Sequence, residues 1–103
     1  MSAVYVRELD GALGAWMNVD FTTDRQDVTN YSIVLLVEED EQIETVRVYD
    51  GAHGENEMHR YSRQGGKQAA EVFHRGTLGE GMRSAIETIE RGYAVMIEGW
   101  RTQ

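Results

Sequence analysis

Apolar and polar residues alternate along the first two thirds of the chain, which is typical of strands with one buried face. Residues 15–24 alternate most regularly, and residues 31–40 are the most apolar segment, which we expect at the centre of a sheet. The strands expected from this pattern are 4–9, 15–24, 31–40, 43–50 and 57–63. Turns, loops or flexible segments are expected between them, at 11–14, 25–30, 51–56 and 64–68. The acidic turn 38–42 joins two of the strands in a predicted β-hairpin.

The period changes to three and four residues in the last third, as in an amphipathic helix. The apolar stripe consists of Leu78, Met82, Ile86, Ile89, Tyr93, Met96 and Trp100. Thr77 and Glu80 match a capping box, in which a hydroxyl and a carboxylate bind free backbone N–H groups of the first turn. The predicted fold is α+β: a four- or five-stranded antiparallel sheet with one long C-terminal helix packed on one face.

Composition limits the classes of protein that the chain can belong to. Its 103 residues, 41% of them hydrophobic, are expected to form a single domain over residues 1–103. A chain of this size buries only about two-thirds of its unfolded surface, so a homodimer would add stability. No segment has the roughly 18 apolar residues that cross a bilayer, and the N-terminus does not match a signal peptide. The absence of cysteine excludes disulfides and thiolate zinc sites, and we expect a cytoplasmic protein.

Charge is distributed unevenly along the chain. The net charge of −8 argues against a protein that coats duplex DNA, because such proteins contact many phosphates with Lys and Arg. Residues 1–57 hold three Lys and Arg against thirteen Asp and Glu, whereas residues 58–75 hold four against one. This basic segment would attract an anionic ligand. Alternatively, its cations form salt bridges with the acidic segments.

Residues 48–68, VYDGAHGENEMHRYSRQGGKQ, carry the residue types of a metal-independent ribonuclease. Histidine suits the removal and donation of protons near neutral pH, and Arg or Lys stabilises the charge that develops on the phosphate. His53 and His59 are the predicted acid and base, and Asp50 would orient one of them. The predicted substrate-binding residues are Arg60, Tyr61, Arg63 and Lys67. In the alternative interpretation, both histidines are ordinary polar surface residues.

Asp50, His53 and His59 could also be one carboxylate and two imidazoles of a metal site. Their spacing matches none of the helical zinc patterns, and the neighbouring cations would repel a divalent ion. We therefore expect no metal and no cofactor.

The segments VRVYDGAHGENEMHRY and GTLGEGMRSAIETIERGYAVMIEGW resemble a family of small uncharacterised bacterial proteins, over roughly residues 30–101. The chain also looks, more loosely, like TumE-type toxins of bacterial toxin–antitoxin pairs, which are small α+β proteins. This second resemblance implies RNA cleavage restrained by a helix-turn-helix antitoxin. It implies functional roles at Tyr49, Asp50, His53, His59 and Arg60.

Two hypotheses of function follow. In the first, the chain is a small ribonuclease of toxin–antitoxin type, whose partners are RNA and an antitoxin. In the second, it is a non-catalytic interaction module whose acidic half binds a basic protein, with association speeded by electrostatic attraction and weakened by salt.

Overall fold

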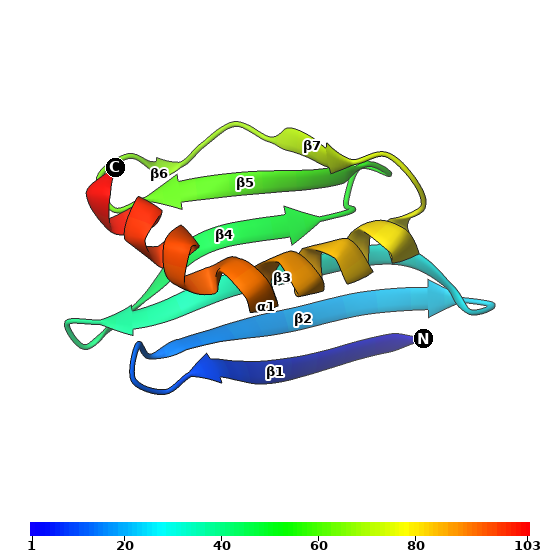
Figure 1. Cartoon of the computed structure of the whole chain (residues 1–103). Coiled ribbons are helices and arrows are strands. Elements are labelled where there is room, and N and C mark those ends of the chain that lie inside the picture. Colours follow the sequence, from blue (N-terminus) through cyan, green and yellow to red (C-terminus); the bar gives the residue numbers. More distant parts are fainter.

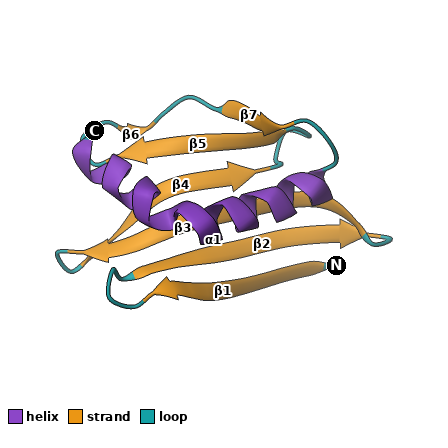
Figure 2. Cartoon of the chain, in the orientation of Figure 1, coloured by secondary structure: helices purple, strands orange, loops and turns teal.

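The computed structural model describes all 103 residues as an antiparallel sheet with one long helix across one face (Figures 1 and 2). The elements are β1 (Ser2–Asp10), β2 (Ala15–Asp24), β3 (Asp27–Glu39), β4 (Gln42–Asp50), β5 (Asn56–Ser62), β6 (Gly66–Lys67), β7 (Glu71–His74) and α1 (Leu78–Thr102). The strands lie in the order β1-β2-β3-β4-β5-β6, and β7 also pairs with β5. The predicted α+β class, with an antiparallel sheet and a C-terminal helix, is confirmed.

The predicted number of four or five strands is wrong, because the sheet has seven. The two missed strands are the shortest, β6 with two residues and β7 with four, and such lengths are too short for an alternating pattern to be recognised. They pair with different parts of β5 and together form one interrupted edge (Figure 1). The flexible segment predicted at 64–68 therefore contains β6.

Two tight turns set the registers of the central hairpins. Arg25 and Gln26 connect β2 to β3 with φ of 51° and 73°, and Asp40 and Glu41 connect β3 to β4 with φ of 53° and 65°. Positive φ at both central residues is what a type I′ turn requires, and this turn matches the twist of the paired strands. The hairpin predicted around 38–42 is confirmed. The loop predicted at 25–30 is wrong in length, because β3 already begins at Asp27.

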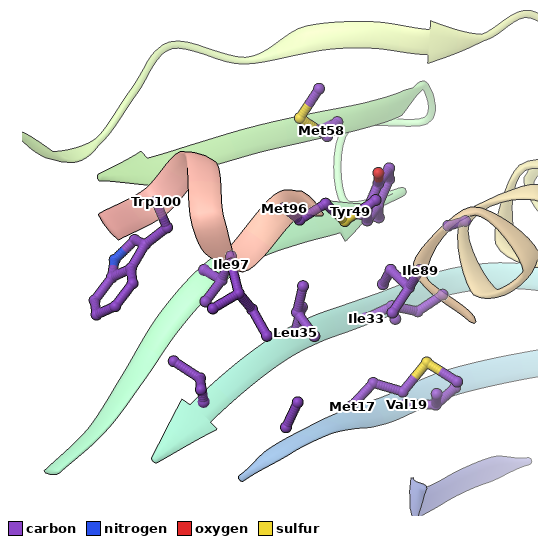
Figure 3. Close-up of a cluster of buried hydrophobic side chains, with 14 of the residues drawn as sticks. Met17, Val19, Ile33, Leu35, Tyr49, Met58, Ile89, Met96, Ile97 and Trp100 are labelled. Atoms are coloured by element: carbon purple, nitrogen blue, oxygen red, sulfur yellow. The ribbon is translucent and has the colours of Figure 1, made fainter. Parts of the chain in front are cut away.

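The hydrophobic core lies between the sheet and α1 (Figure 3). Alternate residues of the strands point toward the helix, as the period of two requires. The fully or nearly fully buried contributors from β2 and β3 are Ala15, Met17, Val19, Tyr31, Ile33, Leu35 and Val37. Ile89, Ile97 and Trp100 of α1 pack against them. α1 lacks the length of apolar sequence that a membrane-spanning helix needs.

Candidate functional site

Asp50 and His59 lie side by side on adjacent strands. In the β4–β5 register Val48 pairs with His59 and Asp50 pairs with Glu57, so these side chains share the face of the sheet opposite α1. His59 Nε2 is 3.7 Å from Asp50 Oδ2. Asp50 Oδ1 accepts a 3.2 Å hydrogen bond from the backbone N–H of Ala52, which fixes the carboxylate at the start of the loop. The structure therefore brings together two of the three predicted catalytic residues.

Both ring nitrogens of His59 face acceptors. Nδ1 lies 3.2 Å from the carbonyl oxygen of Gln68, so it must carry a proton to form that hydrogen bond, and Nε2 faces Asp50. The side chain is only 15% exposed. His59 thus links β4, β5 and the segment after β6. To transfer a proton to a substrate, its imidazole would have to rotate so that Nε2 no longer faces Asp50.

His53 lies in the loop between β4 and β5, with its side chain 81% exposed. Its Nδ1 is 3.0 Å from Glu57 Oε1. The hydrogen bond with Glu57, and then the negative charge of Glu57, raise the pKa of His53. The two histidines therefore have different carboxylate partners, and the structure contains no group of three or more His, Asp or Glu side chains placed to hold a metal ion.

The predicted substrate-binding arginines point away from His59. Arg60 pairs across the strands with Arg47, on the face that α1 covers, and its guanidinium forms an ion pair with Glu71. Arg63 follows β5, forms an ion pair with Glu39, and stacks over the ring of Trp100 at 4.8 Å from its centroid. Arg63 therefore pairs with an acidic segment, as in the alternative interpretation, whereas the partner of Arg60 lies within the basic segment itself.

Tyr61 and Lys67 pair across β5 and β6. Tyr61 is half-buried against the core, and Lys67 is exposed and forms no ion pair. Lys67 is therefore the predicted substrate-binding cation whose charge remains free of a carboxylate.

The face opposite α1, called the open face below, carries acids and no Lys or Arg in β1–β4. The only Lys or Arg side chains of these strands are Arg7 and Arg47, whose strand partners Met17 and Leu35 are fully buried under α1. Both arginines therefore lie on the helix side. The registers place on the open face the carboxylates Glu8, Asp20, Glu38 and Asp50, together with Glu57 of β5.

Apolar side chains separate these carboxylates. They are Val4, Val6, Trp16, Val34, Leu36, Ile43 and Val48. Val4 and Val6 on the edge strand are 70% and 64% exposed. A cavity of about 220 Å³ opens between Asp20 and Asp50, with Ser32 between them. The alternation in residues 15–24 already groups Trp16 with Asp20, but the pattern alone does not say which face a helix covers.

A protein-family model described as "Domain of unknown function (DUF7718)" matches residues 1–102, and the chain belongs to this family. No curated protein and no solved structure matches the chain significantly. The expected membership of a family of small domains is confirmed, and the likeness to TumE-type toxins stays a prediction.

Proposed function

We propose that this member of the DUF7718 family is a non-catalytic interaction module that binds a basic protein through the open face of its sheet. The observation that carries the proposal is the separation of charge: across β1–β4 the open face has carboxylates and no Lys or Arg. A partner that presents Lys or Arg among apolar residues would complement this face in charge and in polarity.

The cavity between Asp20 and Asp50 suits one cationic side chain of such a partner. Its two carboxylates lie on β2 and β4, on either side of Ser32 of β3, so an inserted Lys or Arg would form charge-assisted hydrogen bonds with one or the other. Exposed Val4 and Val6 would supply apolar area beside it. A second copy of the chain fits this face poorly, because two open faces would bring carboxylates against carboxylates.

RNA cleavage is the second candidate function, and the proximity of Asp50 and His59 is the observation that favours it. In this scheme Asp50 orients His59, and His53 on the loop is the second acid–base group. RNA would contact Lys67 and the more distant Arg60, Tyr61 and Arg63. The carboxylates Asp20 and Glu57 on the same face would repel a phosphate, which is why we rank this function second.

Titration with a synthetic peptide that alternates Lys and Leu tests the first candidate, with a Gln-and-Leu peptide of the same length as control. We expect binding that weakens with salt and amide chemical-shift changes in β1 and β2. Asp20→Asn should weaken binding, whereas Glu87→Gln, the same charge change on exposed α1, should not. Salt-insensitive binding, or shift changes confined to α1, would disprove the proposal.

RNA cleavage is tested separately by incubating wild type, His59→Ala and His53→Ala with total RNA, and by inducing each in a bacterial host. Cleavage and growth arrest by the wild type that both substitutions abolish would favour the second candidate. Intact RNA, or cleavage unchanged by both substitutions, would remove it.

A further inference from the structure

A groove with a volume of about 640 Å³ lies between the C-terminal half of α1 and strands β4 and β5. This is within the range of small-molecule sites, roughly 300–1,000 Å³. Figure 1 shows the second half of α1 crossing above these strands toward β6. The groove lies on the helix side of the sheet and is therefore separate from the open face.

Two glycines of α1 keep this groove open. Gly92 and Gly99 are seven residues apart, so they lie on one side of the helix, and both line the groove. A Cβ at Gly99 would meet no atom within 4 Å, and a Cβ at Gly92 would meet only Met96 Cε, at an ordinary 3.5 Å. Glycine weakens a helix relative to alanine. Neighbouring atoms do not require glycine at either position. The effect of the two glycines is therefore to leave the groove free of side chains.

Arg47 lines the groove without a counterion. Its Nε is buried and has no hydrogen-bond partner, and its Nη1 donates one long hydrogen bond, 3.4 Å, to the hydroxyl of Tyr49. No carboxylate lies within ion-pair distance of it. A half-buried guanidinium without an anion is unfavourable, because burial removes water that no other group replaces.

The other two arginines of the groove differ from Arg47. Arg60 pairs with Glu71, and Arg91 pairs with Glu87, although neither acid lines the groove itself. No Asp or Glu is among the lining residues, so the groove is positively charged in a protein of net charge −8. One free guanidinium suits one carboxylate, which it can bind with two parallel hydrogen bonds.

The wall of the groove is apolar. Buried Met96 and Trp100 form part of it, and Val95, 78% exposed, lies at its rim. An apolar side chain as exposed as Val95 in the middle of a helix would gain by contact with an apolar ligand. We propose that the groove binds a small organic carboxylate with an apolar body, whose carboxylate pairs with Arg47 and whose body lies along Met96 and Trp100.

The probe for this proposal is octanoate, titrated into the full chain and followed by calorimetry and by tryptophan fluorescence, with Trp16→Phe used to isolate the signal of Trp100. The controls are 1-octanol, which has the apolar body without the charge, and acetate, which has the charge without the body. Octanoate should bind more tightly than either control. Arg47→Gln should lower the affinity for octanoate by about tenfold or more, which is the usual effect of losing a charge-assisted hydrogen bond. The affinity for 1-octanol should not change.

Three further variants make the result specific. Gly99→Leu should fill the groove and abolish binding of octanoate and octanol, and Arg47→Lys should keep part of the octanoate affinity. Arg83→Gln, the same charge change at an exposed position of α1, should leave the affinity as in the wild type. The proposal is wrong if the wild type does not bind octanoate, if Gly99→Leu still binds it, or if Arg47→Gln and Arg83→Gln have equal effects. If Arg47→Gln fails to fold, the test rests on the other two variants: Gly99→Leu must abolish octanoate binding, and Arg47→Lys must keep part of it.

Discussion

The hydroxyl of Tyr31 donates a 2.7 Å hydrogen bond to Oδ1 of Asn56 inside the core. The Nδ2 of Asn56 donates in turn to the carbonyl oxygens of His74, Gly76 and Thr77, at 3.2–3.3 Å. Asn56 is 1% exposed. One buried amide side chain therefore connects β3, β5 and the segment that leads into α1, and all of its polar atoms have hydrogen-bond partners.

Asn56→Asp should destabilise the fold by about 3 kcal/mol or more, because a buried carboxylate would face carbonyl oxygens that now accept from Nδ2. Burial and then the charge of Asp50 raise the pKa of Tyr31, so its hydroxyl stays protonated and offers the new carboxylate only one hydrogen bond. Urea unfolding measures the loss. Asn30→Asp, at an exposed position of β3, is the matched control and should change stability by no more than about 0.5 kcal/mol. Equal losses in the two variants would contradict this role of Asn56.

Alanine substitutions at two glycines of α1 should have opposite effects. A Cβ at Gly81 would overlap the side-chain amide of Asn56, so Gly81→Ala should destabilise the fold by roughly 2 kcal/mol or more. Gly92→Ala should stabilise it by about 0.5–1 kcal/mol, because its Cβ makes only an ordinary contact with Met96. Thermal unfolding of both variants checks the pair. A loss of stability in Gly92→Ala would show that the helix requires glycine at that position.

The contribution of Asn56 could not be predicted from the sequence. It ends the segment predicted as the loop 51–56, and its partners at 74–77 are far along the chain, so no local pattern indicates its burial. The five longer strands, the central hairpin and the helix were predictable, because each has a hydrophobic period over several residues. The Thr77 and Glu80 capping box was predictable because its spacing is local, and the structure contains it.

The candidate site was predictable in part. Both 43–50 and 57–63 were predicted as strands, and their antiparallel pairing in the structure places Asp50 beside His59. The separation of His59 from Arg60 also follows from the sequence once 57–63 is a strand, because neighbouring strand residues point to opposite faces. The sequence does not predict that Arg47 lacks an ion pair, because this depends on which carboxylates from distant parts of the chain lie within ion-pair distance.

His53 should titrate above the ordinary histidine pKa in the wild type, and Glu57→Gln should lower its pKa toward that ordinary value. A histidine with a raised pKa in the folded state contributes stability that is fully present below its unfolded pKa. That contribution disappears as the pH rises through the folded pKa. A titration of the histidine ring protons by NMR checks the shift. An unchanged His53 midpoint in Glu57→Gln would contradict the assignment of Glu57 as the cause of the raised pKa.

Thr77→Ala should destabilise the helix by about 1 kcal/mol, because the hydroxyl of Thr77 accepts a 3.1 Å hydrogen bond from the backbone N–H of Glu80. The backbone N–H and the hydroxyl of Thr77 in turn donate to Glu80 Oε1, and these bonds lower the pKa of Glu80. Thr77→Ser keeps the hydroxyl and should keep most of the stability.

The pH dependence of the unfolding free energy distinguishes the contribution of the Glu80 carboxylate from that of the Thr77 hydroxyl in this capping box. A carboxylate with a lowered pKa contributes stability that is present above its unfolded pKa and is lost as the pH falls through the folded pKa. Glu80→Gln should therefore differ from the wild type most at neutral pH, and the difference should shrink as unfolding is measured at steps down to about pH 3. Thr77→Ala should raise the pKa of Glu80 toward its ordinary value, because one of its two donors is lost. A stability difference between Glu80→Gln and the wild type that stays constant with pH would mean that the ionised carboxylate adds nothing to the cap beyond what a neutral amide supplies.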